Sequence, residues 1–409
     1  MNAAPQLSTP AESLTWGATG GLSASAGVGS ASDVKTALAD KPPVAPSACA
    51  VLPAQLATPK HARTATRVAL AGSLTGFCSP GGGEVQLRSL ATWLPNVGVN
   101  ARPWRPWEDD WDAFDVLHLV GSTPEWVELA VAARRAGKPV CVSPVTWFTL
   151  RDLWREPWPL ARRAWAGIKY AARSACPRLP SWRRRLYDAA NLLLPNSQLE
   201  AEQLRRLFGI ADDKLRVVPN GADARFAAAD AELFQRTTGW RDFVLCVGRL
   251  EPRKNQLGLL RALRGTGLPI VLLGDVVPGH EDYLRACQQA ATDDVLFLRR
   301  VDHESPLLAS AYAACRCLAL VSWYETPGLA SLEAGLTGAP LVLTADGACQ
   351  EYFGAHARYV SPEDDGAIRA AVWDAYHAPR SPELAVHVGQ HFTGDAVARA
   401  TKEAYETLL

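Results

Sequence analysis

Apolar and polar residues are distributed differently on the two sides of residue 66. From Arg67 onward, short apolar runs alternate with longer amphipathic stretches, a pattern typical of βα repeats that build a parallel sheet. The predicted strands form two series, at 67–72, 115–121, 139–144, 191–195 and 215–219, and at 243–249, 269–275, 295–300, 317–322 and 340–346. This pattern predicts an α/β chain with two doubly wound, Rossmann-like domains.

The residues before this pattern show no sustained periodicity. Ala, Gly, Ser, Thr and Pro account for 38 of the first 60 residues, so this segment has too little apolar surface to offset the entropy lost on ordering it. We therefore predict a disordered, low-complexity tail over 1–65. The predicted domains are 66–222 and 223–385, followed by a terminal helix over 386–409.

The charge balance and the cysteines narrow the class of protein. The chain has 409 residues with 42 basic and 42 acidic side chains, and this balance argues against a nucleic-acid partner. No apolar run is long enough to span a membrane, and we expect no secretory signal, because no charged and then apolar region opens the sequence. The nine cysteines form no CxxC pair, which favours core residues over disulfides or a zinc site. We expect a cytoplasmic protein.

Three segments that follow predicted strands carry the candidate chemistry, because ligands of open α/β sheets bind at the carboxyl ends of the strands. The first is the glycine run at 81–83, which opens a predicted helix and favours an anion; a plain tight turn is the alternative. The second is GRLEPRKNQ at 248–256, where Arg249 and Lys254 suit a diphosphate. A solvated pair of charges is the alternative there.

The third segment, SWYETPGLASLEAGL at 322–336, carries Glu325 and Glu333 on either side of a Pro-Gly-Leu turn. A helix that begins near Leu329 places Glu333 one turn inside and directs the N–H groups of 328–330 out of its start. A carboxylate and such N–H groups suit a ribose and a phosphate. The alternative, two solvated surface glutamates, fits poorly with the apolar residues around them.

These segments resemble the nucleotide-sugar-dependent glycosyltransferases of family 4, whose GT-B fold consists of two facing Rossmann-like domains. The resemblance covers nearly all of 66–409 and rests on motifs in a fixed order: PGGGEVQ, PNSQLEAEQLRRLFG, VVPNGAD, VGRLEPRKN, the E-x7-E pair and TADGACQEYFG. It implies an N-terminal acceptor domain, a C-terminal donor domain and a last helix that packs back on the N-terminal domain.

The resemblance also implies roles for individual residues. The implied catalytic set is Arg249, Lys254 and Glu325, in which the two cations neutralise the diphosphate and Glu325 contacts the donor sugar. The implied donor-binding residues, among which Glu333 holds the ribose, are Gly82, Gly83, Gly248, Gly328, Leu329 and Glu333. The family retains the anomeric configuration of the sugar, and the resemblance implies a nucleotide-sugar co-substrate with neither a cofactor nor a metal.

Two departures from the family pattern concern the sugar. Many members have Gly-Phe where this chain has Thr-Pro at 326–327, and many have a histidine that faces the donor sugar where this chain has Val-Thr-Trp at 145–147. His118 in the second predicted strand is a candidate acceptor contact, with a buried core histidine as the alternative.

The segment 151–185 is unusually basic and aromatic. It holds ten Lys or Arg residues against two acids, together with Trp154, Trp158, Trp165 and Trp182. Between Leu160 and Ala175 its apolar positions share one helical face, and a basic amphipathic helix of this kind can lie on an anionic membrane surface. A domain helix with its apolar face in the core is the alternative.

The leading hypothesis is a retaining, metal-independent hexosyltransferase that acts on a glycan or lipid-linked acceptor in bacterial surface polysaccharide synthesis, peripheral at the inner face of the plasma membrane. The triplet Asp110-Trp111-Asp112 imitates a metal-binding DxD, but it follows a turn rich in Pro and Trp, so we interpret it as a solvated loop. One alternative function is a catalytically silent relative that binds a nucleotide sugar or a partner. A nucleotide-sugar epimerase is less favoured. A nicotinamide dehydrogenase is less favoured still, because no predicted strand is followed by a GxGxxG motif with an acidic residue downstream.

Overall fold

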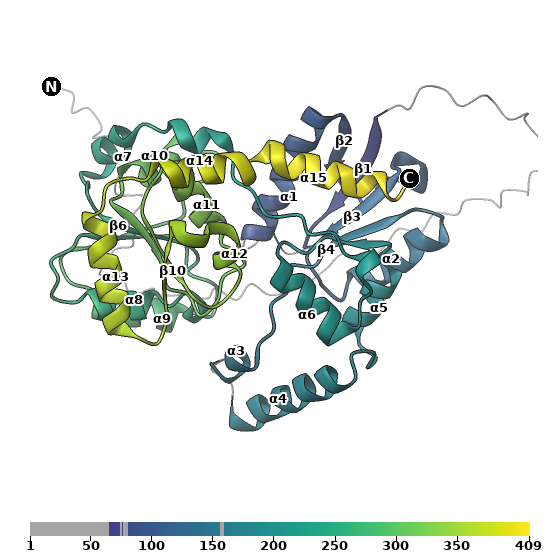
Figure 1. Cartoon of the computed structure of the whole chain (residues 1–409), viewed down its shortest axis with the longest axis horizontal. Helices are drawn as coiled ribbons and strands as arrows, with labels where there is room; N and C mark the ends of the chain where they lie inside the picture. The colour runs from purple at the N-terminus through teal and green to yellow at the C-terminus, as the bar shows by residue number, and fades with distance from the viewer. Residues whose placement is uncertain (1–64, 74–75, 77–80, 156–158) are drawn as a thin grey trace, which may run out of the picture. The chain divides into compact units, whose positions relative to one another are not determined.

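The computed structural model describes residues 65–409 except 74–75, 77–80 and 156–158. The predicted tail lies outside these residues apart from Ala65. The described part of the chain contains two parallel, doubly wound sheets, which confirms the predicted fold class (Figure 1). The predicted domain boundaries at 222/223 and 385/386 stay predictions.

The first sheet takes its strands from the N-terminal half, in the order β2-β1-β3-β4-β5, and every neighbouring pair is parallel. Alternate residues of β1 belong to two different buried clusters, because helices cover both faces of the sheet. The strands are β1 (Thr66–Ala71), β2 (Val99–Pro103), β3 (Val116–Val120), β4 (Val140–Ser143) and β5 (Leu192–Leu193). The helices are α1 (Gly82–Trp93), α2 (Trp126–Arg135), α3 (Leu150–Arg155), α4 (Leu160–Ala175), α5 (Trp182–Ala189) and α6 (Gln198–Phe208).

The second sheet has the order β11-β10-β9-β6-β7-β8 and is also parallel throughout. Three of its inner strands, β7, β9 and β10, are apolar and buried along their whole length, as expected when both faces are covered. The strands are β6 (Val244–Val247), β7 (Ile270–Leu273), β8 (Val295–Leu298), β9 (Cys317–Leu320), β10 (Leu341–Thr344) and β11 (Arg358–Val360). The helices are α7 (Ala231–Thr238), α8 (Gln256–Leu263), α9 (Glu281–Ala290), α10 (Pro306–Ala314), α11 (Leu329–Leu336), α12 (Cys349–Phe353) and α13 (Asp365–His377).

Most predicted strands are present, and the exceptions lie near sheet edges. The segment 215–219 is not a strand but extends along β5, with a single bridge between Leu215 and Leu193. The edge strands β2 and β11 are not predicted, because both are partly exposed and lack the continuous apolar run of a strand inside the sheet.

Two C-terminal helices return the chain to the first sheet. α14 (Pro382–His391) buries Leu384 and Val388 with the C-terminal core. α15 (Gly394–Glu406) lies beside α1 and β1 (Figure 1), and its Tyr405 belongs to the same buried cluster as Trp93 of α1. This packing confirms the prediction that the last helix returns to the N-terminal domain.

Candidate functional site

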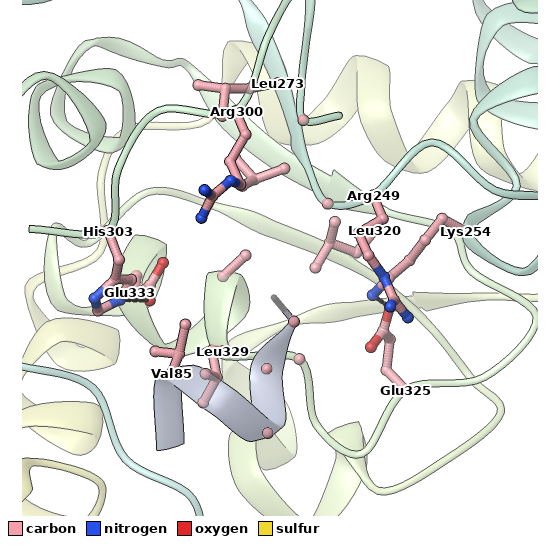
Figure 2. A pocket seen from close by; sticks show the side chains of 18 of the residues that line it. Val85, Arg249, Lys254, Leu273, Arg300, His303, Leu320, Glu325, Leu329 and Glu333 are labelled. Atoms are coloured by element: carbon pink, nitrogen blue, oxygen red, sulfur yellow. Dashed lines mark hydrogen bonds and ion pairs between the residues drawn. The ribbon is translucent and has the colours of Figure 1, made fainter. Parts of the chain in front are cut away.

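A cavity of about 750 Å³ lies among the carboxyl ends of strands from both sheets. This is where open α/β sheets bind ligands, and the volume is in the range of small-molecule pockets. Figure 2 shows Arg249, Lys254 and Glu325 at one end of the cavity and His303 with Glu333 at the other.

The turn after β6 places three cations beside the cavity. Arg249 and Arg253 both bind Glu251, with guanidinium nitrogens 3.3 and 2.9 Å from its Oε1. The Arg253 guanidinium also lies 5.2 Å from the ring centre of Tyr324. Burial by itself would lower the pKa of Arg253, but the neighbouring glutamates raise it above its ordinary value. The turn therefore holds fixed positive charge at the strand end.

The third cation, Lys254, forms a buried ion pair with Glu325. Its Nζ lies 2.5 Å from Glu325 Oε1, and the two side chains are 13% and 5% exposed. The Ser322 hydroxyl donates to the same oxygen at 2.6 Å. Burial by itself would raise the pKa of Glu325, but Lys254 and Arg253 hold it below its usual value. Glu325 is therefore a carboxylate that fixes the ammonium group at the cavity.

Gly328 connects Glu325 to the start of α11. Its φ of +81° lies in the left-handed region that side chains disfavour, and an added Cβ would lie 3.1 Å from Glu325 Oε2. Leu329 and Ala330 follow as the first helical residues and line the cavity. Because the first N–H groups of a helix have no intrahelical acceptor, the start of α11 is a favourable place for an anion.

Glu333 lies one turn inside α11 and receives two hydrogen bonds. The Tyr312 hydroxyl donates to Oε2 at 2.5 Å, and His303 Nε2 lies 2.8 Å from Oε1. Burial lowers the pKa of His303, but its contact with Glu333 outweighs this and raises the pKa above the ordinary value. A carboxylate has about four acceptor positions, so Glu333 keeps acceptor capacity for ligand hydroxyls.

The opposite side of the cavity is formed by the start of α1. Glu84 accepts a hydrogen bond from the N–H of Gly81 at 2.8 Å and so caps this helix end. A Cβ added at Gly81 would lie 3.6 Å from Arg249, and one added at Gly82 would lie 3.9 Å from Leu329. The glycine run therefore brings its backbone close to the cationic turn and to the start of α11.

The loop after β4 contributes an aromatic ring from the same side. Trp147 stacks on Tyr324 with ring centres 6.3 Å apart and planes inclined by 20°. The backbone N–H of Thr146 donates to the buried carboxyl of Glu200 at 2.5 Å, and the N–H of Asn196 donates to its other oxygen at 2.7 Å. Glu200 thus fixes the loop that carries Trp147.

The structure brings together every residue of the predicted catalytic and donor-binding sets. All line the one cavity: Gly82, Gly83, Gly248, Arg249, Lys254, Glu325, Gly328, Leu329 and Glu333. His118 does not line it. His118 is buried under α15, with Nδ1 2.7 Å from the Tyr405 hydroxyl and Nε2 2.9 Å from Ser143 Oγ, and burial lowers its pKa to about 4. The surroundings of His118 therefore match the alternative given for it, a buried core histidine.

In the described ranges, metal binding and membrane crossing would need a cluster of ligating side chains and a long apolar helix. No group of three or more His, Cys, Asp or Glu side chains there is arranged to hold a metal ion, and no helix there has the length and apolarity to cross a membrane. In the DxD-like triplet, Asp110 accepts a hydrogen bond from the N–H of Asp112 at 3.0 Å and caps a short helical turn.

Among the described cysteines, Cys176 is exposed and the others are buried, and none is paired.

Sequence reasoning missed several residues that line the cavity, among them Arg253, Arg300, His303 and Tyr312. Arg300 and His303 follow β8, so the rule that ligands meet the carboxyl ends of strands could have found them. Tyr312 has no such signal, because it lies inside α10 and reaches Glu333 only through the packing of α10 on α11.

Two family models match the chain in succession. Residues 82–226 match Glycosyltransferase Family 4, and residues 241–377 match Glycosyl transferases group 1. D-inositol 3-phosphate glycosyltransferase of Kribbella flavida is 30% identical over 220 residues, which is 48% of this chain and 51% of that protein. O-antigen chain mannosyltransferase B of Escherichia coli is 27% identical over 239 residues, which is 54% of this chain and 62% of that protein. The chain thus spans about half the length of the curated relatives it matches.

Solved structures share the fold over most of the chain. Sucrose-phosphate synthase of Thermosynechococcus elongatus superposes with a TM-score of 0.65 at 17% identity, over 84% of this chain and 99% of that one. HepE of Anabaena, solved in complex with UDP and glucose, gives a TM-score of 0.62 at 18% identity, over 83% and 99%. These identities show the fold alone, which is GT-B. The two matched models, over 82–226 and 241–377, show that the chain belongs to glycosyltransferase family 4, the group 1 glycosyltransferases.

Proposed function

We propose that the protein transfers a hexosyl group from a nucleoside diphosphate sugar to a hydroxyl acceptor, with retention of the anomeric configuration. The observation that carries this proposal is the cationic end of the cavity. There Arg249, Lys254 and the start of α11 lie together, and Glu333 lies at the opposite end. A diphosphate at the first end and a ribose at Glu333 match the charges that each end presents.

In this proposal the cations act on the leaving group. As the bond between the anomeric carbon and the phosphate oxygen breaks, negative charge grows on the diphosphate, and Arg249 and Lys254 stabilise it where it forms. The acceptor oxygen bonds to the same face of the anomeric carbon, and its proton passes to the departing phosphate. Glu325 holds Lys254 in place and contacts the sugar, while Gly82 and Gly83 close over the sugar from the other side.

We infer the finer features of the reaction from relatives. HepE was solved with UDP-glucose, and a relative in Mycolicibacterium smegmatis is a GDP-mannose-dependent phosphatidylinositol monomannoside mannosyltransferase. A further relative is the O-antigen chain mannosyltransferase B of Escherichia coli. We propose a glycan or lipid-linked acceptor, and a role in bacterial surface polysaccharide synthesis.

A second candidate function is a silent relative that binds a nucleotide sugar without transferring it. The observation that favours it is Trp147, which stacks on Tyr324 in the loop where many members have a histidine. Binding of a nucleotide sugar does not separate the two functions, but turnover does.

The test measures transfer of label from a panel of radiolabelled nucleotide sugars into a bacterial glycolipid extract. Transfer from one donor, abolished in Lys254→Ala and kept in Lys402→Ala, supports the proposal; Lys402 is an exposed lysine paired with Glu406 on α15. A donor that binds without any transfer, and without release of its nucleoside diphosphate, would favour the silent relative.

A further inference from the structure

The helix α4 turns its apolar side away from the protein. None of its residues is buried, and its three large aliphatic or indole side chains are exposed: Leu160 at 72%, Trp165 at 56% and Ile168 at 59%. In a helix that packs by its apolar face, these residues would lie in the core. The alternative for this segment, a domain helix with its apolar face in the core, is therefore wrong.

The polar side of α4 holds the helix against α6. Arg173 lies over the ring of Phe208, with its guanidinium carbon 4.9 Å from the ring centre. The Tyr170 hydroxyl accepts a hydrogen bond from Arg206 at 2.6 Å, and the Tyr170 ring packs against the N-terminal core. Contacts of this kind fix the rotation of the helix about its axis, so the apolar face is held outward rather than exposed by chance.

The charges around this face have one sign. From residue 159 to residue 185 the sequence has no Asp or Glu and eight Lys or Arg residues. Arg162 and Lys169 are exposed at the border of the apolar face. Lys169 Nζ lies 5.1 Å from the Trp165 ring centre, so a cation and an indole lie side by side on the surface. A partner that covers this face must accept apolar side chains and carry negative charge at its edge.

A neighbouring helix extends the same surface. α3 packs against α4, and its Leu150 and Trp154 are 43% and 51% exposed. In Figure 1 the two helices lie next to each other, below the rest of the N-terminal half in that view. Together α3 and α4 present indole and aliphatic side chains over more than a single turn of helix.

We propose that α4 docks on an anionic lipid bilayer, with Leu160, Trp165 and Ile168 in the boundary between headgroups and acyl chains. Its 16 residues are too few to span a membrane, but a basic helix with a broad apolar face suits the bilayer interface. A second copy of the chain is a poorer occupant, because the same basic borders would repel each other across the contact. The proposal rests on α4 and is independent of sugar transfer.

The test is co-sedimentation of the full chain with vesicles of phosphatidylglycerol and phosphatidylcholine, and with vesicles of phosphatidylcholine alone, at low salt. We expect the protein to pellet with the anionic vesicles and to be released by added salt. Trp165→Asp with Ile168→Asp should lower the partition coefficient at least about tenfold, and Lys169→Glu about fivefold to tenfold. Trp373→Asp, at an exposed indole of α13, is the matched control and should leave it unchanged.

Three outcomes would overturn the proposal. The first is no pelleting of the wild-type chain with anionic vesicles at low salt. The second is equal pelleting of the α4 double variant, checked for folding by its thermal unfolding. The third is a dimer in light scattering that the same double variant abolishes. That result would show that a second copy of the chain covers this face. Nucleotide binding measured on the same samples separates loss of docking from loss of the donor site.

Discussion

On the C-terminal side of the cavity, the charged groups Lys254, Glu325 and Glu333 are largely buried and are held by ion pairs and hydrogen bonds. Lys254 lies 2.5 Å from Glu325, and Glu333 receives hydrogen bonds from His303 and Tyr312. On the N-terminal side, no described lining residue is charged: glycine backbone and the Trp147 ring lie there with uncharged side chains such as Val85 and Gln86. One buried acid, Glu200, fixes the loop that carries Trp147. The first wall is arranged for charge, and the second for close approach and stacking.

This difference assigns separate tasks to the two walls. Buried charges in fixed positions stabilise a charged ligand without reorganising when it binds or reacts. Backbone and an aromatic ring require no charge on the ligand. Such a wall can therefore accommodate different sugars when the sequence of its loop changes. We therefore expect substitutions on the C-terminal wall to affect the reaction and those on the N-terminal wall to affect affinity or stability.

The largest effect is expected for Lys254→Ala. Loss of one fixed cation at the leaving group should lower the transfer rate about 10²–10³-fold. The variant also leaves Glu325 as an unpaired buried charge, which should reduce the free energy of unfolding by about 3 kcal/mol. Adding Glu325→Gln should restore most of the stability and none of the transfer. Steady-state kinetics and chemical denaturation check both parts, and unchanged kinetics would show that this wall does not act on the leaving group.

A smaller effect is expected from titration of Glu200, which is buried behind the N-terminal wall. Burial raises the pKa of Glu200 from its ordinary 4.5 to about 7, so the native state binds a proton that the unfolded state has released. Its contribution to stability is complete below pH 4.5 and is lost as the pH rises through 7, in total about 3 kcal/mol. Denaturation curves between pH 4.5 and 8 measure this slope. Glu200→Gln should flatten it, and an unaltered slope would assign it to other groups.

Glu333→Gln should weaken binding of the nucleoside part of the donor about 10- to 100-fold, because hydrogen bonds to a charged acceptor are replaced by bonds to an amide. Glu383→Gln is the matched control at the solvent-exposed start of α14. Calorimetric titration with the donor's nucleoside diphosphate compares the two variants. Equal affinity in both would remove Glu333 from the nucleoside site.

The smallest effect is expected for Trp147→Ala. Loss of the stacked pair with Tyr324 should raise the KM for the sugar donor roughly threefold to tenfold. Affinity for the free nucleoside diphosphate should change little, since Trp147 lies on the opposite wall from Glu333 and Lys254. If both affinities fell equally, the ring would act on the nucleotide and the division between the walls would be wrong.

The parts of the site that follow from local spacing could be predicted from the sequence. The Pro-Gly-Leu turn sets where α11 begins, so it places Glu333 inside the helix and Glu325 before it. The strand-end rule could place His303 at the cavity, but its pairing with Glu333, like that of Tyr312, could not be predicted. Both residues lie on other elements and meet Glu333 only after the second sheet forms. Spacing likewise predicts the amphipathic pattern of α4, but not which side faces the protein, since Phe208 and Arg206 of α6 decide that.

Prediction of the strands from the sequence is also limited at the edges of the two sheets. Strands inside a sheet are buried on both faces and appear as apolar runs, whereas β2 and β11 are partly exposed and contain polar residues. The segment 215–219 has the apolar run of a strand but forms a single bridge. Local pattern thus predicts the interior of each sheet better than its borders.

We propose that the cavity binds a nucleoside diphosphate sugar through its C-terminal wall. Calorimetric titration with UDP, GDP, ADP and TDP and their common sugars tests this binding on the wild type, Lys254→Ala and Lys402→Ala. One nucleotide series should bind the wild type and Lys402→Ala equally, and Lys254→Ala at least about tenfold more weakly. Absence of binding by every nucleotide, or equal binding by all three proteins, would show that this wall does not hold the diphosphate.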